Sequence, residues 1–392
     1  MSLAGDIGVQ EHLALNAGNL DSRGKLTAQS IAVEASGHAR LAGSHSAAGP
    51  LSISAGTLDL AGSSNYAADI ALAARTGDLD ARSATLAATD TLSASTPNAL
   101  RLDQAKVAAE RLALSAHDLS NRGGELIQTG NGDFSITLAG TLDNTGGKLL
   151  SGGNTALTAG SLNNASGAIY ADRNLTLTTT QTNNAGGRLT AAQGDLKHTQ
   201  SGRGGGSAGT QEAGGNLLLT SAGSLGFGSA DRLSAGQHLT LNAGGDIASA
   251  GRWVANGTVS AQAANLTLQS GSRIDGQSIA LYAGNALTGS GTTLSGDHLA
   301  LNGGLLALTG STLSSGSAAN LTSGSTLNLA GSKLTAATDT TLSAQGGMDT
   351  RGVSVLTGGH LAVGAATLDN RGGELAAKAG LGITATKIDN AQ

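Results

Sequence analysis

Four asparagines occupy the same place in successive copies of one motif. Asn121, Asn144, Asn164 and Asn184 each stand third in an eight-residue Leu-x-Asn-x-Gly-Gly-x-Leu pattern that tolerates Thr, Ser or Ile at single positions. A row of amides could bind the hydroxyls of a sugar. It could equally hydrogen-bond along a stack of coils and satisfy turn carbonyls. We expect the second, structural role for this asparagine ladder.

Four histidines invite a metal-binding interpretation, because each directly precedes an alternating apolar run: His12, His238, His298 and His360. The last three are spaced by about three turns of the sequence repeat. At ~4.8 Å per turn they would lie roughly 14 Å apart, too far to share an ion. Asn174, Asn265 and Asn320 take the equivalent place elsewhere, so we expect a polar turn position and no metal or cofactor.

Catalysis by a carbohydrate-active enzyme would need carboxylates that converge on one groove. The acids are scattered, and the one close pair is Asp78 and Asp80, with Arg75 and Arg82 beside it. We therefore expect no enzyme activity and regard a carbohydrate-active β-helix enzyme as the weaker alternative. The Gly204-x-Gly206-x-x-Gly209 match to a dinucleotide fingerprint lacks the strand and helix that must flank it.

Arg252 and Trp253 are the best candidates for contact with a partner, because Trp and Arg dominate binding hot spots. They stand where the spacing of the alternating runs lengthens, between the run at Leu239 and the run at Leu266. Arg203, in a glycine-rich stretch, is a third candidate. The alternative, which we favour for Trp253, is a residue packed within an irregular loop.

Short strands must position all of these residues. Apolar residues two apart, as in Phe134-x-Ile136 or Leu175-x-Leu177, put one face of a strand inward and one outward. The asparagine steps 144→164→184 are equal, and a fixed period of this length is typical of a solenoid. The paired glycines would break a helix. We therefore predict an all-β chain, a single elongated parallel β-helix with three sides and about 20 residues per coil.

Composition restricts the remaining classes. Aromatics make up only 2% of the 392 residues, so Leu, Ile, Val and Ala must fill a narrow interior. Cysteine is absent, which excludes disulfides. A net charge of −5 gives no basic footprint for nucleic acid, and no apolar run is long enough to span a membrane. No secretion signal or capping helix is apparent, so we expect a segment of a longer stack.

The chain divides by pattern into four segments. Residues 1–110 carry irregular coils, residues 111–197 carry the most regular repeats, and residues 216–392 form a second block of coils. Between them, the glycine-rich residues 198–215 show no alternation, so we predict an exposed loop that leaves the solenoid.

The Leu-x-Asn-x-Gly-Gly-x-Leu motif, followed by Asn-Leu-Thr-Leu strands, resembles the haemagglutinin repeats of the filamentous haemagglutinin adhesins and contact-dependent growth-inhibition effectors. The resemblance implies a right-handed β-helix shaft, secreted through an outer-membrane partner transporter and displayed on the bacterial cell surface. An Asn-Pro-Asn secretion motif and a toxin domain are not seen, so transporter recognition and toxicity are not carried over.

Two functions are consistent with these observations. The first is a non-catalytic shaft of an adhesin that attaches to a host-cell or bacterial receptor, for instance a glycan. Its variant is the stalk of a growth-inhibition effector that presents a receptor-binding tip and a toxin. The second is a binding module in which the loop at 198–215 and the region of Trp253 form the contact face.

Overall fold

Every regular element of the protein is a β-strand. A computed structural model describes residues 1–202 and 206–391, and within these ranges it contains strands and turns but no helix. The strands pair in parallel, so the predicted all-β solenoid is confirmed. The chain forms two compact units, residues 1–197 and 198–392, and the boundary falls within β28 (Leu196–Gln200). In the described part, no helix has the length and apolar character needed to cross a membrane.

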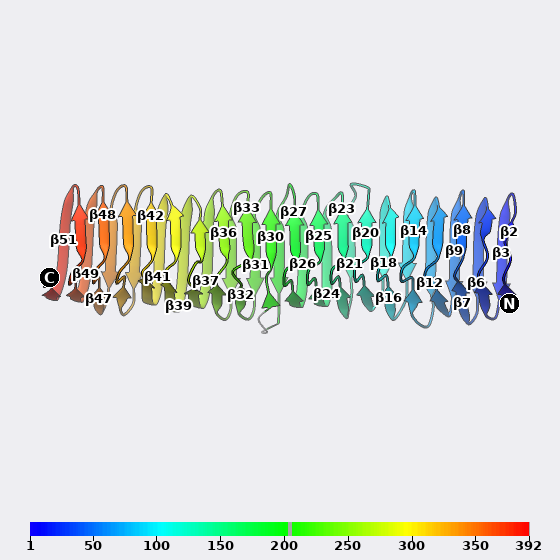
Figure 1. Cartoon of the computed structure of the whole chain (residues 1–392), viewed down its shortest axis with the longest axis horizontal. Helices are drawn as coiled ribbons and strands as arrows, with labels where there is room; N and C mark the ends of the chain where they lie inside the picture. Colours follow the sequence, from blue (N-terminus) through cyan, green and yellow to red (C-terminus); the bar gives the residue numbers. More distant parts are fainter. Residues whose placement is uncertain (203–205, 392) are drawn as a thin grey trace. The chain divides into compact units, whose positions relative to one another are not determined.

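Each coil of the first unit has three sides (Figure 1). Side 1 contains β3 (His12–Ala17), β6 (Ser30–Ala35), β9 (Pro50–Ala55), β12 (Asp69–Ala74), β15 (Thr91–Ser95), β18 (Arg111–Ser115) and β21 (Phe134–Thr137). Side 2 contains β1 (Ser2–Leu3), β4 (Leu20–Ser22), β7 (His38–Leu41), β10 (Thr57–Asp59), β13 (Leu79–Asp80), β16 (Ala99–Arg101), β19 (Asp118–Ser120) and β22 (Thr141–Asp143). Side 3 contains β2 (Ile7–Gly8), β5 (Leu26–Ala28), β8 (Ser44–Ala47), β11 (Ser64–Ala67), β14 (Thr85–Ala88), β17 (Lys106–Ala109), β20 (Glu125–Gln128), β23 (Lys148–Ser151), β25 (Ala168–Ala171) and β27 (Arg188–Ala191). β24 (Thr155–Asn163) and β26 (Leu175–Asn183) each continue from side 1 into side 2.

The second unit repeats this plan. Its side 1 contains β31 (Leu217–Ser221), β34 (Leu239–Ala243), β43 (Ala319–Ser323) and β46 (Thr340–Ala344). Its side 2 contains β29 (Gly206–Ser207), β32 (Leu225–Phe227), β35 (Ile247–Ser249), β44 (Leu327–Asn328) and β47 (Gly347–Asp349). Its side 3 contains β30 (Thr210–Ala213), β33 (Arg232–Ala235), β36 (Arg252–Ala255), β38 (Arg273–Asp275), β40 (Thr293–Gly296), β42 (Thr312–Ser315), β45 (Lys333–Ala336), β48 (Ser354–Thr357) and β50 (Glu374–Ala377). Five strands cover sides 1 and 2 together: β37 (Thr258–Leu268), β39 (Ser278–Ser290), β41 (His298–Thr309), β49 (His360–Asp369) and β51 (Gly380–Asp389).

The interior of each coil is a stack of aliphatic side chains. In β26, Leu175 and Leu177 are fully buried, whereas Thr176 between them is only half-buried and Thr178 is exposed. The predicted register of this strand is therefore confirmed. Leu177 pairs with Leu157 in the preceding coil. Where leucine recurs at the coil period, as at Leu157 and Leu177, buried leucines pack on leucines of the next coil, whereas Leu175 is in register with the buried Thr155.

The paired glycines of the motif serve two separate needs. Gly146 adopts a φ of 62°, in the left-handed region that glycine enters without steric cost. Gly147 has an ordinary φ, but a Cβ there would overlap the backbone oxygen of Asn121 in the preceding coil. The first glycine therefore makes the turn, and the second lets adjacent coils approach. In one copy Ser166 replaces the first glycine and keeps its φ, at 54°.

The predicted loop over residues 198–215 is wrong where three strands occupy parts of this segment. Residues 206–207 and 210–213 form β29 and β30, and His198 and Gln200 lie in β28 with buried side chains. Gln211 points inward, fully buried, and its amide donates to the Ala208 carbonyl at 3.2 Å. A search for alternating apolar residues misses this strand because its inward residue is polar. Residues 203–205 lie outside the described residues.

Candidate functional site

The asparagine ladder lies inside the first unit. All four side chains are buried, and each amide donates to the next: Asn121 Nδ2 to Asn144 Oδ1 at 2.8 Å, then 2.7 Å at each of the two later steps. The same amide nitrogens reach turn carbonyls, as Asn144 Nδ2 does to Gly147 O at 3.1 Å. The amide nitrogens of Asn121, Asn144 and Asn164 are therefore occupied by the fold, and the four buried side chains do not face a ligand.

Trp253 is in the core of the second unit. It lies in β36, in register with Leu233 and Ile274, and only 1% of its surface is exposed. Its ring meets that of Phe227 edge to face, with 5.6 Å between centroids. The indole cannot serve as a surface anchor in this coil, so the predicted contact through Trp253 is wrong. Its packed alternative is right, but in a regular strand and not in a loop.

The apparent irregularity near Trp253 has a simple origin. The side 1 strand that follows Leu239 is formed by Val259-Ser260-Ala261, and Leu239 pairs with Val259 one coil later. Leu266-x-Leu268 belongs to side 2, where it pairs with Ile247-x-Ser249. Alanine in place of leucine hid the first strand from the sequence pattern. The long spacing from Leu239 to Leu266 therefore runs from a side 1 strand to a side 2 strand, and it is not an irregular coil.

Of the two arginines predicted as partner contacts, only Arg252 lies among the described residues. Arg252 is on the outer face of β36, where its Nη2 donates to Asp275 Oδ2 at 3.1 Å. Arg273 of the next coil bonds the same carboxylate at 2.8 Å, so Asp275 neutralises one of these two positive charges. Arg203 lies outside the described residues. Contact of a partner with Arg252 stays a prediction.

The four histidines lie where strands begin: His12, His298 and His360 are the first residues of β3, β41 and β49, and His238 directly precedes β34. His238 Nδ1 accepts from the Thr258 backbone N–H of the next coil at 3.0 Å, and Asn174 Oδ1 does the same for Asp195 at 2.8 Å. Among the described residues no three His, Asp or Glu side chains come together as metal ligands. Asn320 was predicted to take the same place as these histidines, which is wrong, because it lies within β43 opposite Ala300 and faces outward.

A charged groove crosses side 2 of the first unit. It has a volume of about 370 Å³, and its lining includes Arg101, Asp103, Arg122 and Asp143. Both arginines are already paired: Arg122 Nε lies 2.6 Å from Asp143 Oδ2, and Arg101 Nη2 lies 2.7 Å from Asp78 Oδ2 outside the lining. A charged ligand would have to displace these ion pairs.

The close carboxylates Asp78 and Asp80 do not form a catalytic pair. Each is engaged by its own arginine, and Arg82 Nη2 lies 2.6 Å from Asp80 Oδ2. Partial burial raises the pKa of Asp80, but hydrogen bonds from Arg82 outweigh it and hold that pKa below its usual value. A glycosidase acid needs a raised pKa, so Asp80 is unsuited to that role.

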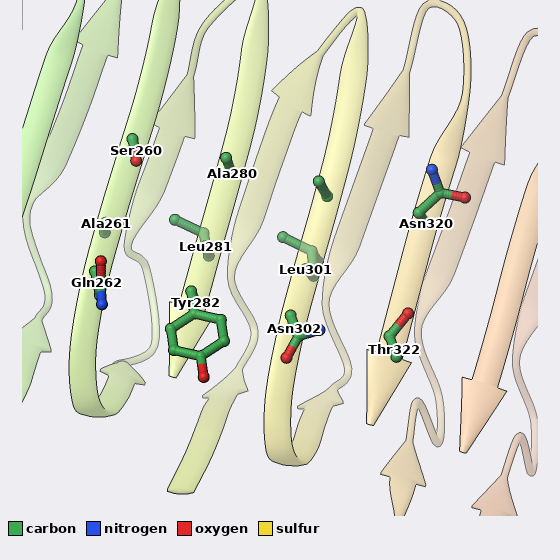
Figure 2. A pocket seen from close by; sticks show the side chains of 11 residues that line it. Ser260, Ala261, Gln262, Ala280, Leu281, Tyr282, Leu301, Asn302, Asn320 and Thr322 are labelled. Atoms are coloured by element: carbon green, nitrogen blue, oxygen red, sulfur yellow. The ribbon is translucent and has the colours of Figure 1, made fainter. Parts of the chain in front are cut away.

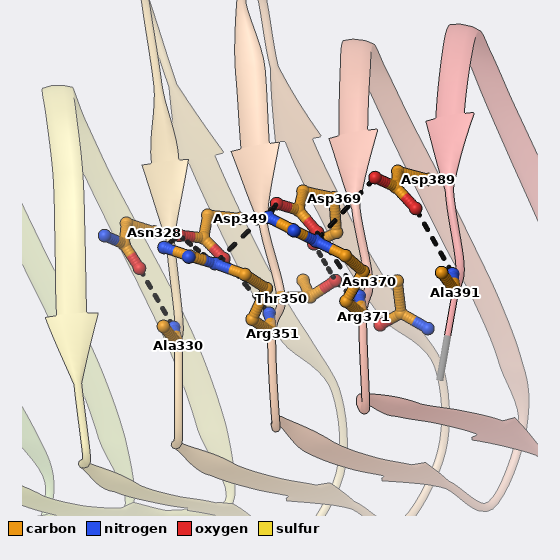
Figure 3. Close-up of polar contacts among 10 residues, drawn as sticks. All are labelled: Asn328, Ala330, Asp349, Thr350, Arg351, Asp369, Asn370, Arg371, Asp389 and Ala391. Carbon is orange, nitrogen blue, oxygen red and sulfur yellow. Dashed lines mark hydrogen bonds and ion pairs between the residues drawn. The ribbon is translucent and has the colours of Figure 1, made fainter.

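The same Asp-x-Arg arrangement forms a row in the second unit (Figure 3). Asp349 and Arg351 pair at 2.6 Å, Asp369 and Arg371 pair at 2.7 Å, and each arginine also approaches the aspartate of the next coil at 3.7 Å. The hydrogen bonds from Arg371 lower the pKa of the Asp369 carboxyl to about 2. These exposed pairs hold adjacent turns together and contribute little individually.

A second groove, uncharged, lies on side 1 of the second unit (Figure 2). It has a volume of about 290 Å³ and is lined by residues of β37, β39, β41 and β43. Tyr282 stands at its centre and is 49% exposed. Gln262 and Asn302 occupy the matching positions of the coils on either side, because the register aligns Gln262, Tyr282 and Asn302.

The polar groups of this groove are not used by the fold. In the described part of the chain, the side chains of Gln262, Tyr282, Asn302 and Asn320 form no hydrogen bond with the protein. The amide of Asn144, by contrast, is bonded to the next coil. Small residues, among them Ala280, lie beside the tyrosine and leave its ring accessible.

Sequence reasoning did not identify this groove, although the sequence contains a signal for it. Tyr282 follows the inward Leu281, so alternation places it outside, and Gln262 and Asn302 stand one coil before it and one coil after it. Counting outward residues at the coil period would have brought the three together.

A family model for the haemagglutinin repeat matches most of the chain. The matches cover residues 2–62, 42–103, 93–146, 135–229, 303–352 and 349–392. The chain belongs to the haemagglutinin-repeat family. This confirms the resemblance based on the Leu-x-Asn-x-Gly-Gly-x-Leu motif. The matches end at residue 229 and resume at 303, so Gln262, Tyr282 and Asn302 lie in the unmatched stretch between them.

A curated protein related to this haemagglutinin-repeat chain is "Toxin CdiA" of Yersinia pestis. The two are 37% identical over 155 residues, which is 38% of this chain. The aligned part is 5% of the length of that protein, so the comparison concerns a small portion of it. No solved structure matches the chain.

Proposed function

We propose that this chain is a non-catalytic shaft segment of a large secreted bacterial protein of the two-partner secretion type, which an outer-membrane partner transporter delivers to the cell surface. Membership of the haemagglutinin-repeat family supports the shaft and the secretion route. We further propose that the intact protein is an adhesin, which attaches to a receptor on host cells or on other bacteria.

The observation that supports this proposal is that the repeated residues of the coils are used to pack one coil on the next. In the regular coils the buried leucines stack at the coil period, and the asparagine amides are consumed by hydrogen bonds between coils. The arginines of the groove on side 2 of the same unit are paired with neighbouring aspartates. Each such coil is stabilised by its contacts with the two neighbouring coils, so whole coils can be added or removed as units.

Deleting whole coils tests the shaft role. In the full-length protein, removal of residues 144–183 joins Asp143 to Asn184, which stands where Asn144 stood. We expect surface display and attachment to persist, because register is kept. The matched control removes residues 144–193, half a coil more, and should abolish display by breaking the stack. Loss of attachment after the first deletion, with display intact, would contradict a shaft role for these coils.

The alternative is the stalk of a contact-dependent growth-inhibition effector that presents a receptor-binding tip and a toxin. The similarity to Toxin CdiA favours it. Co-culture of bacteria that display the full-length protein with related target bacteria distinguishes the two. Growth arrest of the targets on contact supports the effector. Adherence without arrest supports the adhesin.

A further inference from the structure

The groove around Tyr282 differs from the charged groove on side 2 of the first unit, because its polar side chains form no hydrogen bonds that hold adjacent coils together. Gln262 and Asn302 flank the ring in the same outward row, and adjacent coils are ~4.8 Å apart. Asn320 and Thr322 extend the lining into the next coil. An exposed aromatic ring with free amides on both sides is thus held on a rigid sheet.

The chemistry of these groups is that of a receptor for uncharged hydroxyl-rich ligands. The face of a tyrosine ring is apolar and can pack against the C–H groups of a sugar ring. Each amide offers a donor and an acceptor, which matches the paired hydroxyls of a sugar. The lining contains no charged residue, so it provides nothing to neutralise a sulfated or phosphorylated polymer.

A protein partner fits this surface less well. Protein interfaces need a larger desolvated centre with several apolar or aromatic anchors. The groove has one aromatic residue and a volume of about 290 Å³. It is also open along the stack, which suits a chain of sugar rings lying across several coils.

The position of the groove adds an independent observation. Gln262, Tyr282 and Asn302 fall within residues 230–302, which the repeat model does not match, whereas the coils before and after are matched. The fold is maintained there, since β37, β39 and β41 pair in register with two local shifts, at Ala263/Asn265 and Ala283/Ala286. The sequence therefore departs from the repeat while the coil remains.

We propose that this groove binds a neutral oligosaccharide, with one sugar ring stacked on Tyr282 and its hydroxyls bonded to Gln262, Asn302 and Asn320. The proposal goes beyond the shaft role, because a shaft needs no ligand. It assigns a receptor contact to the side of the second unit, independently of any site elsewhere in the intact protein.

The test uses the 392-residue chain and measures binding by calorimetry and by saturation-transfer NMR. The neutral probes are cellohexaose, maltohexaose and N-acetylchitohexaose, and a heparin-derived hexasaccharide is the anionic probe. We expect at least one neutral probe to bind, with saturation transferred to its ring protons. Tyr282→Ser should weaken this binding on the order of tenfold, and Asn302→Ala by about threefold.

Tyr66→Ser is the matched control, since Tyr66 is 47% exposed but lies on side 3 of the first unit. Tyr66→Ser should leave binding of the neutral probe unchanged. Tyr282→Phe should retain most of the binding, because it keeps the aromatic ring. Unfolding curves verify that the outward substitutions leave the coil folded. The proposal is overturned if no neutral probe binds, if Tyr282→Ser has no effect, if Tyr66→Ser is equally harmful, or if the heparin fragment binds best. None of these outcomes bears on the shaft role, which the coil deletion tests separately.

Discussion

The hydroxyl of Thr350 lies 2.8 Å from the side-chain oxygen of Asn370 and donates a hydrogen bond to it. Asn370 in turn donates to Asn390 at 2.7 Å, so this short row begins with a satisfied acceptor. The longer row that begins at Asn121 has no such cap. Its Oδ1 is buried without a partner, because the residue in the position of Thr350 is the apolar Leu102. An unpaired buried oxygen costs stability.

We predict that a hydroxyl at position 102 will cap the ladder. Leu102→Thr and Leu102→Val create nearly the same loss of volume, but only threonine can donate to Asn121 Oδ1. The threonine variant should therefore be the more stable by about 1 kcal/mol, the reverse of the usual order in an apolar core. Denaturant unfolding of the two variants measures the difference. A more stable valine variant would show that the introduced hydroxyl does not reach the amide.

A charge placed inside the regular coils should be far more harmful than one placed outside. Leu177→Asp puts a carboxylate at a fully buried position against Leu157, whereas Thr176→Asp adds it to the outer face. We expect the first to cost more than about 3 kcal/mol and the second less than about 1 kcal/mol. Thermal unfolding of the pair compares them. Greater damage from Thr176→Asp would mean that the register of β26 is shifted by one residue.

The two glycines of one turn should respond differently to a methyl group. Gly146→Ala forces alanine into the left-handed region, at a cost of about 1–2 kcal/mol. Gly147→Ala should cost more, because its Cβ would collide with the backbone oxygen of Asn121 and push two coils apart. Chemical unfolding of both variants tests the order. Equal losses would indicate that the coil spacing adapts to the added methyl.

Acid should destabilise the folded chain as the pH falls from 6.5 toward 4. Burial lowers the pKa of His198 to about 4, against the opposing hydrogen bond with Gln211, and burial also lowers the pKa of His45. The unfolded chain, with histidine pKa values near 6.5, then binds more protons than the folded chain in this window. Stability is therefore full above pH 6.5 and declines as pH falls, by about 2 kcal/mol at pH 5 for His198 alone. Denaturant midpoints at pH 7 and pH 5 measure the loss.

His45→Asn separates histidine protonation from other effects of acid. His45 Nδ1 donates to Asn65 Oδ1 at 2.9 Å, and an asparagine amide can make the same bond without titrating. The variant should lose less stability than the parent in the first unit when the pH falls from 7 to 5. An identical loss of stability in the variant and the parent would show that protonation of His45 does not contribute to the acid sensitivity. Carboxylates such as Asp369, with a pKa of about 2, titrate below this window.

Much of the fold could be predicted because the coil is a local and repeated structure. Alternation identified Leu175 and Leu177 as inward, and the equal steps of the asparagines gave the stacking partner of each residue. A strand has only two faces, so a period of two is sufficient to assign them. A ladder of amides follows once identical residues stack at the strand spacing.

The positions of Trp253, Gln211 and the Tyr282 groove were decided by the tertiary structure. Inward residues in β30 and β37 include glutamine and alanine, which carry no apolar signal, so only pairing with neighbouring coils reveals those strands. Which outward residues share a groove depends on register between coils, and the shifts in β37 and β39 change that register within a single strand. The chain alone specifies which way a side chain faces, and the stack of coils determines what it faces.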